Sequence, residues 1–170
     1  MTDVKHNLGN NNTGTDQKEI LAKIFSPTRG KVLMLQDVND DVFRKEIIGK
    51  GAAVYPEIDE IYAPVNGTIA YIPETKHALM MTSAEGLEIL IHVGLETVAL
   101  HGAPFEFHVE IGDEVSKGDL LMTFDRKALL EQGFDIVTPV VVTNIEEFEH
   151  IVPVHEDRVE ISDCLINILK

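Results

Sequence analysis

The sequence predicts an all-β fold, an antiparallel β-sandwich with one or two short helices. Short runs rich in β-branched residues alternate with Gly, Pro, Asn and Asp, a pattern typical of strands and tight turns. A Pro-x-x-Gly turn that leads into such a run occurs twice, beginning at Ser26 and at Ala63. The repeated unit indicates a sheet that closes on, or stacks against, a similar half. With 170 residues, the chain is long enough for one domain with a sizeable core.

The expected strands begin after a polar N-terminal segment. Residues 1–16 are rich in Asn, Thr and Gly and lack periodicity, so we expect a disordered tail followed by a single domain over residues 17–170. We expect this domain to be free-standing. Residues 17–25 fit either a short helical turn or a first strand. The later strands are expected at residues 31–35, 52–55, 67–72, 120–124, 140–143 and 161–169.

Short helical segments are expected at three places. Residues 41–46 and 145–148 each fit a single turn. Residues 125–133 make a better helix, with Asp125 as the N-cap and Gly133 at its end. The single cysteine, Cys164, cannot form an internal disulfide, and we expect it to be buried and inert in the last strand.

Two histidines, His77 and His92, lie in neighbouring strand-like runs on either side of a Ser-Ala-Glu-Gly turn. A neutral imidazole nitrogen can attack an electrophile and form a covalent intermediate. A second imidazole beside it can donate a hydrogen bond to the charge that develops. Thr75, two residues before His77, should project to the same face and fix a ring tautomer. Gly94 should leave room for a large partner. We therefore predict a catalytic pair supported by Thr75.

The pairing register decides whether the two rings share a face. A two-residue loop of Ala84 and Glu85 would put His77 directly opposite His92, about 5 Å apart at Cβ. A left-handed bulge at Gly86 would shift the pairing by one residue and turn His77 away. We predict the first register, because it separates a core face from a semi-polar face. The core face would then hold Ala78, Met80, Thr82, Leu87, Ile89 and Ile91.

Composition excludes several classes of function. A net charge of −15 argues against nucleic acid and against docking on anionic lipid. The chain has neither an apolar run long enough to span a membrane nor an export signal, so we expect a cytoplasmic protein.

A zinc-binding β-domain is an alternative interpretation of the histidine pair, because imidazole is a common zinc ligand. Two histidines supply only two ligands, however, and the sequence places no clear third.

These residues resemble the glucose-type IIA component of the bacterial phosphoenolpyruvate:sugar phosphotransferase system. The resemblance covers roughly residues 20–170, and its most specific part is Thr-x-His together with Leu-Ile-His-Val-Gly. Weaker matches are the two Pro-x-x-Gly turns and the segments at residues 37–43, 49–51, 112–119 and 138–142. Glu96 stands where one branch of the family usually has the shorter Asp.

The resemblance implies a β-sandwich of the barrel-sandwich hybrid type. It implies that His92 accepts a phosphoryl group from the phosphohistidine of the carrier HPr and passes it to a cysteine of a IIB domain of a sugar permease. His77 would then bind the phosphoryl group, with Thr75 as its support. No cofactor is required, although His77 and His92 could share a zinc ion at a partner interface. The protein would visit the inner face of the membrane transiently through the permease.

A docking face is expected around the pair. Leu79 and Leu90 flank the histidines and would form an apolar patch if exposed. The resemblance adds further positions to this face, namely Asp40, Val42, Phe43, Leu90, Glu96 and Val98. Regulatory targets could use the same face, so a non-catalytic regulatory binding protein is the alternative function.

Overall fold

The computed structural model describes residues 18–170, and the tail expected over residues 1–16 lies outside them. The strands are β1 (Ile20–Phe25), β2 (Gly30–Met34), β3 (Lys50–Pro56), β4 (Glu60–Tyr62), β5 (Gly67–Tyr71), β6 (Ala78–Ser83), β7 (Glu88–His92), β8 (Phe105–Phe107), β9 (Glu114–Val115), β10 (Leu120–Phe124), β11 (Thr138–Val142), β12 (His150–Pro153), β13 (Arg158–Val159) and β14 (Cys164–Leu169). The helices are α1 (Asp41–Arg44) and α2 (Arg126–Glu131), with 3-10 turns η1 (Leu35–Asp37), η2 (Thr97–Leu100) and η3 (Ile145–Glu147).

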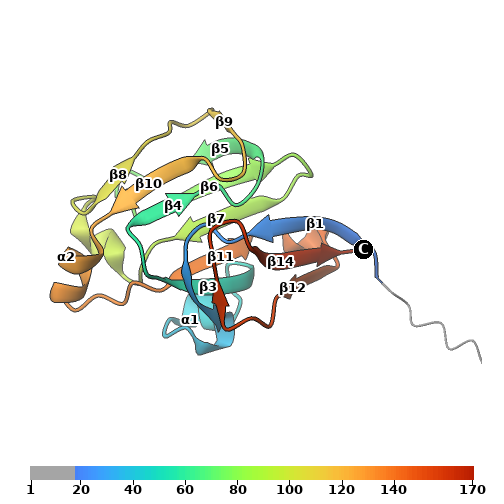
Figure 1. The fold of residues 1–170 in the computed structure, drawn as a ribbon, viewed down its shortest axis with the longest axis horizontal. Helices are drawn as coiled ribbons and strands as arrows, with labels where there is room; N and C mark the ends of the chain where they lie inside the picture. The colour runs from blue at the N-terminus through green and yellow to red at the C-terminus, as the bar shows by residue number, and fades with distance from the viewer. Residues whose placement is uncertain (1–17) are drawn as a thin grey trace, which may run out of the picture.

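All strand pairs are antiparallel, and they form three sheets (Figure 1). An eight-stranded sheet has the order β13-β2-β3-β11-β7-β6-β5-β9, and two three-stranded sheets have the orders β1-β14-β12 and β4-β10-β8. The predicted all-β sandwich with short helices is therefore confirmed. Within the expected segment 17–25, Ile20–Phe25 form strand β1 rather than a helical turn. Asp125 caps α2 as predicted, because its side chain accepts a hydrogen bond from the amide of Ala128.

The two Pro-x-x-Gly turns exchange hydrogen bonds reciprocally. The amide of Phe25 donates to the carbonyl of Pro64 at 3.0 Å, and the amide of Tyr62 donates to the carbonyl of Pro27 at 2.7 Å. The two donors are 37 residues apart in the chain, as are the two acceptors. Interchanging the turns maps one bond onto the other, so an approximate twofold axis relates them.

The same relation extends to a second pair of turns, which contain Asp163 and Asp119. The amide of Ser26 donates to Asp163 at 2.7 Å, and the amide of Ala63 donates to Asp119 at 2.8 Å. Strand β2 pairs with β3 and β13 in the same way that β5 pairs with β6 and β9. Strands β7 and β11 pair with each other and join the halves. The prediction of two similar halves is confirmed.

Apolar side chains pack on both faces of the eight-stranded sheet. On one face, the two small sheets cover the main core, which includes Ile24, Ile61, Met122 and Ile166. On the other face lies a smaller group, here called the outer cluster. It consists of Leu35, Val38, Phe43, Ala53, Ala78, Leu90, Leu95, Val137 and Val141, partly covered by η1 and α1. The central strands are therefore buried on both faces.

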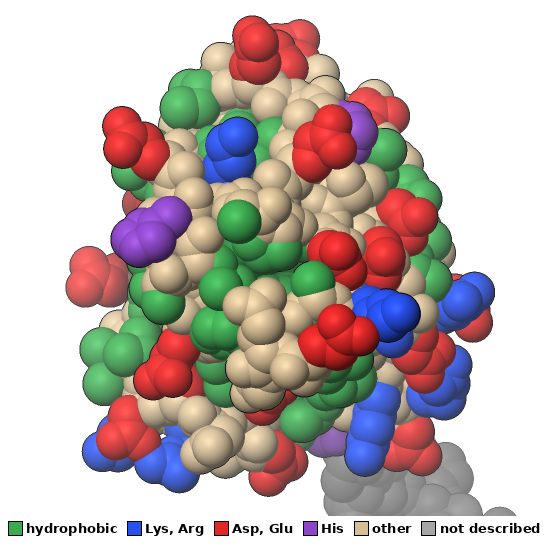
Figure 2. All heavy atoms as spheres, turned by 90° about the vertical axis from the view of Figure 1, so that its left-hand side faces the viewer, with side chains coloured by type: hydrophobic (Ala, Val, Ile, Leu, Met, Phe, Trp, Pro, Cys, Tyr) green, Lys and Arg blue, Asp and Glu red, His purple; other side chains and the backbone are tan. Residues whose placement is uncertain are grey.

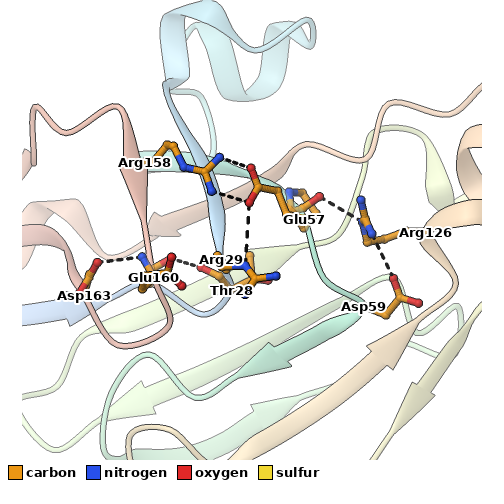
Figure 3. Close-up of polar contacts among 10 residues, drawn as sticks. Thr28, Arg29, Glu57, Asp59, Arg126, Arg158, Glu160 and Asp163 are labelled. Carbon is orange, nitrogen blue, oxygen red and sulfur yellow. Dashed lines mark hydrogen bonds and ion pairs between the residues drawn. The ribbon is translucent and has the colours of Figure 1, made fainter.

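Three of the four arginines of this acidic chain gather near the turn that follows β3 (Figure 3). Both terminal guanidinium nitrogens of Arg158 donate to Glu57, and Nε of Arg29 lies 3.9 Å from the same carboxylate. Arg126 donates to the carbonyl of Pro56 and lies 3.7 Å from Asp59. Exposed ion pairs contribute little to stability individually. Together these contacts connect the turn after β3 with the turn before β2, with β13 and with α2.

The predicted register of the β6–β7 hairpin is wrong by one residue. Ala78, not His77, is paired with His92, and Leu79 is paired with Ile91. The loop has three residues because Gly86 adopts a left-handed conformation with φ of +88°. The alternation could not decide the register, because the outer cluster makes the second face of these strands apolar as well.

The correct register changes which residues face the main core. Leu79, Met81, Ile89 and Ile91 are fully buried there, whereas Ala78 and Met80 belong to the outer face. The predicted assignment of Ala78, Met80 and Thr82 to the core face is therefore wrong. Leu79 has an exposed fraction of 0%, so its predicted role in docking is also wrong.

Leu79→Ala should lower the free energy of unfolding by about 2–5 kcal/mol, because it leaves a cavity in the main core. Met80→Ala, one residue further on and half-buried on the outer face, should cost roughly 1 kcal/mol. Urea denaturation followed by circular dichroism measures both changes. A larger loss for Met80→Ala than for Leu79→Ala would contradict the observed register.

Candidate active site

His92 is the last residue of β7, and one of its ring nitrogens is committed to the backbone. Nδ1 lies 2.7 Å from the carbonyl oxygen of Gly94. A carbonyl oxygen can only accept a hydrogen bond, so Nδ1 must carry a proton. In the neutral ring, the lone pair is then on Nε2. The backbone thus selects the tautomer whose Nε2 can act as a nucleophile.

The local backbone requires glycine at position 94. The sequence analysis had instead explained Gly94 by access for a partner. The residue is buried and has φ of +77°, a region that favours glycine. A Cβ atom at this position would lie 2.6 Å from Cγ2 of Thr97 and 3.0 Å from the carbonyl oxygen of Asp135. A larger residue would therefore crowd Thr97 and Asp135 and be strained by the left-handed φ.

His77 lies just before β6, and its ring faces that of His92. The ring centroids are 4.8 Å apart, and the planes meet edge to face at 79°. In a regular strand, His77 would point to the same side as Leu79, into the main core. Strand β6 begins only at Ala78, however, so His77 lies outside the regular strand, directly after Lys76 with its left-handed φ of +54°. The predicted proximity of the two histidines is therefore confirmed despite the wrong register.

Thr75 contacts His77 as predicted. Its hydroxyl oxygen lies 2.8 Å from Nδ1 of His77. A hydroxyl that donates to Nδ1 keeps the proton of the neutral ring on Nε2. His77 would then present an N–H donor toward the space beside His92, whereas His92 presents a lone pair. With the hydroxyl of Thr75 as the donor, the two rings hold complementary tautomers.

Burial keeps both histidines neutral near pH 7. The pKa of His92 is lowered from 6.5 to about 4, mainly because burial disfavours the charged ring and secondarily because His77 lies beside it. The hydrogen bond to Gly94 and the charge of Asp40 raise the pKa of His92, but by less. Burial also lowers the pKa of His77. The ring of Phe43, with its centroid 5.2 Å from that of His92, forms part of the apolar surround.

The predicted docking residues divide into two groups. Val42 and Val98 are 42% and 49% exposed, Glu96 is exposed, and Asp40 is half-buried while it caps α1. Phe43 and Leu90 are 3% and 8% exposed and belong to the outer cluster. The first group can meet a partner, and the second forms the floor beneath the histidines. Their role in docking stays a prediction.

An apolar hollow of about 360 Å³ lies beside the pair on the same face of the sheet. Its lining includes Ile48, Tyr71, Pro73, Met80 and Leu90. The sequence analysis missed Ile48 and Tyr71. Tyr71 is 55% exposed, and Ile48 follows the 68% exposed Ile47, so the signal was a set of large apolar residues that the core does not need. Figure 2 shows apolar side chains gathered at the centre of the side on which α2 lies in Figure 1, with acidic side chains around them.

Metal-binding side chains do not form a complete site within residues 18–170, where no group of three His, Cys, Asp or Glu is placed to hold an ion. The histidine pair can offer two imidazoles. A zinc ion at this position would therefore need further ligands from a partner, and the interface zinc stays a prediction.

Cys164 is half-buried on β14 rather than buried as predicted, and burial raises the pKa of its thiol. Over residues 18–170, no helix is long and apolar enough to cross a membrane.

Comparison with known proteins places the chain and its fold in a family. Residues 22–148 match the family described as phosphoenolpyruvate-dependent sugar phosphotransferase system, EIIA 1. The chain belongs to this EIIA family. Its resemblance to the glucose-type IIA component is confirmed, and the chain is a component of a phosphotransferase system.

Relatives of this EIIA domain are much longer proteins. The chain is 44% identical over 149 residues to a "PTS system beta-glucoside-specific EIIBCA component" of Dickeya chrysanthemi, covering 88% of the chain and 23% of the relative. It is 46% identical over 125 residues to the component of the same description of Bacillus subtilis (strain 168), covering 74% of the chain and 20% of the relative. The chain thus spans less than a quarter of the length of these relatives.

A solved structure matches the EIIA domain over nearly its whole length. Glucose permease IIA from Mycoplasma capricolum superposes with a TM-score of 0.80 at 34% sequence identity. The match covers 86% of this chain and 94% of the other. The fold of the domain is therefore that of a known IIA protein.

The low pKa of His92 can be measured by titration of the imidazole ¹⁵N signals. His92 should titrate at about 4, well below 6.5. His77→Gln should raise the pKa of His92 only partly, because burial is the larger cause. A His92 that titrates near 6.5 in the native EIIA domain would contradict the description of the site.

The same pKa difference makes stability depend on pH. Between pH 6.5 and about 4, the unfolded chain binds more protons at His92 than the folded chain does. The free energy of unfolding should therefore fall as the pH falls through this window, by up to about 1.4 kcal/mol per pH unit from this group. Urea denaturation at several pH values should show a weaker decline for His92→Gln than for the native protein. Equal slopes would show that His92 makes no such contribution.

Proposed function

We propose that this chain carries a phosphoryl group on Nε2 of His92, accepting it from the phosphohistidine of HPr and passing it to a cysteine of a IIB domain during sugar uptake. The hydrogen bond from Nδ1 of His92 to Gly94 carries the proposal, because it leaves the lone pair on Nε2. His77, with its ring centroid 4.8 Å away, supports it as a second group at the same position.

In the proposed step, Nε2 of His92 attacks the phosphorus in line with the bond to the carrier. The new bond between Nε2 and phosphorus forms as the bond to the carrier's ring nitrogen breaks, and that nitrogen takes the electron pair. Such transfers need positioning and charge stabilisation more than covalent assistance. Nε2–H of His77 donates to a phosphoryl oxygen, and the hydroxyl of Thr75 keeps the proton of His77 in place. The second transfer, to the IIB cysteine, runs by the same geometry.

The surround of the pair suits a phosphoryl carrier. Phe43 and Leu90 are buried beneath the site, and the apolar hollow adjoins it. A docked protein that covers the hollow would exclude water and so limit loss of the phosphoryl group by hydrolysis. Val42 and Val98 are exposed apolar residues available for that contact.

The relatives support a IIB partner. The names of the Dickeya and Bacillus proteins combine B, C and A components in one polypeptide. Relatives at similar identity are described as specific for beta-glucoside, glucose or glucosamine. Different sugars are expected if the A component meets only proteins and another component binds the sugar. We place the domain in the cytoplasm, in transient contact with the inner face of the membrane through its permease.

Substitution of each histidine separates the two proposed roles. With phosphoenolpyruvate, enzyme I and HPr, His92→Gln should abolish labelling of the chain, because glutamine offers no nucleophilic ring nitrogen. His77→Gln should still accept the label but pass it to a IIB domain poorly, because a donor to the phosphoryl oxygens is altered. Radiolabelled phosphate followed through both steps measures these effects.

His101→Gln is the matched control, since His101 is an exposed histidine that does not belong to the pair. It should behave like the native protein in both steps. Loss of labelling in His101→Gln, with full labelling of His92→Gln, would refute the assignment.

A further inference from the structure

The peptide unit between Val93 and Gly94 is held at both of its polar ends. The hydroxyl of Thr97 donates to the carbonyl oxygen of Val93 at 2.6 Å. The amide of Gly94 donates to the carbonyl oxygen of Val137 at 3.0 Å. Because a peptide unit is planar, two bonds at opposite edges fix the orientation of the whole plane.

The next peptide unit, between Gly94 and Leu95, carries the carbonyl that binds His92. Its oxygen accepts from Nδ1 of His92 at 2.7 Å, and its amide donates to the carbonyl oxygen of Asp135 at 2.9 Å. The two units meet at the left-handed φ of Gly94, +77°. The direction of the Gly94 carbonyl therefore depends on the orientation of the preceding unit, which Thr97 holds.

Thr97 is fully buried at the start of η2, and its hydroxyl binds the Val93 carbonyl rather than a nitrogen of either histidine ring. Among residues 18–170, two side chains donate hydrogen bonds to these two peptide units: the ring of His92 and the hydroxyl of Thr97. Its methyl group lies against Gly94, 2.6 Å from the position that a Cβ atom would occupy there. The hydroxyl and the methyl group of Thr97 thus both lie against the turn at residues 93–95.

We propose that Thr97 is a positioning residue for phosphoryl transfer, holding the Gly94 carbonyl so that His92 keeps its proton on Nδ1 and its lone pair on Nε2. The proposal rests on the proposed function of His92 but concerns a residue outside the reacting pair. Without the hydroxyl, the buried Val93 carbonyl loses its partner and the first peptide unit is held at one end only. The Gly94 carbonyl can then turn away from Nδ1, and the proton can move to Nε2, where it blocks attack.

Three variants test this role. Thr97→Val keeps the shape but removes the donor, and Thr97→Ser keeps the donor but removes the methyl group. Ser26→Ala is the matched control, because Ser26 is equally buried and its hydroxyl also donates to a carbonyl, that of Thr28, at 2.6 Å. The ¹⁵N signals of the His92 ring report its tautomer in each protein without any phosphorylation. The rate of labelling by phosphorylated HPr and the urea midpoint are measured alongside.

The native protein and Thr97→Ser should show the Nδ1-protonated pattern at His92. Thr97→Val should show a mixture of tautomers and a labelling rate lower by roughly 10- to 100-fold, the size of effect expected from a small misplacement of a reacting group. Ser26→Ala should lower the urea midpoint but keep the native tautomer and rate.

Several outcomes would overturn the role of Thr97. One is a Thr97→Val protein with the native ¹⁵N pattern and labelling rate. Another is an equal loss of rate in Thr97→Val and Ser26→Ala, which would indicate a merely structural effect. Should Thr97→Val fail to fold, a mixture of tautomers in folded Thr97→Ser would overturn it as well. Failure of the native protein to be labelled would refute the proposed function instead, while the ¹⁵N comparison would still stand.

Discussion

The hydrogen bond between Nδ1 of His92 and the carbonyl of Gly94 is the interaction on which the chemistry of this domain depends. An isolated neutral imidazole can carry its proton on either nitrogen, and only one tautomer leaves Nε2 free. The fold fixes that choice with a backbone carbonyl, which cannot change its own protonation state. The left-handed Gly94, the Asp135–Val137 segment and the buried Thr97 hold this carbonyl in place. The position of the Gly94 carbonyl thus determines that Nε2 of His92 is the reactive ring nitrogen.

The approximate twofold symmetry shows how a polar site fits on a sheet that is apolar on both faces. In the half built around β3 and β11, the outer face holds Ala53 and Val141, both fully buried in the outer cluster. In the half built around β6 and β7, the outer face ends in the histidine pair. In this half, the histidine pair and an apolar hollow lie on the same face of the sheet. The two halves share the same strand pairing, and the site lies where one half differs from the other, at the histidine pair.

Much of this arrangement could be predicted from local sequence patterns. Strands β2, β3, β5, β10 and β11 and the cap at Asp125 follow from β-branched runs and turn residues whose effects are local. The contact between Thr75 and His77 was predicted from an extended segment, in which residues two apart share a face, but the structure forms it across a turn with Lys76 in the left-handed conformation. The histidine pair was predicted for a partly wrong reason. The two rings meet because β6 begins only after His77, next to Lys76, whose left-handed conformation has no signal in the residue type.

The remaining features depend on contacts between distant segments. Alternation could not fix the hairpin register, because the outer cluster draws its residues from η1, α1 and four strands and makes both faces of β6 and β7 apolar. Leu79 was therefore placed on the wrong face. Gly94 was assigned to partner access because the carbonyl of Asp135, which a side chain would meet, lies 41 residues away in the chain. The sequence analysis gave Thr97 no role, since its bond to Val93 appears only once η2 is built.

The most direct test of the account is a ¹⁵N–³¹P correlation spectrum of the uniformly ¹⁵N-labelled protein after incubation with phosphoenolpyruvate, enzyme I and HPr. The account predicts phosphorus bonded to Nε2 of His92, with Nδ1 of the same ring still protonated. Phosphorus bonded to Nδ1 of His92, or to any other histidine, would contradict it.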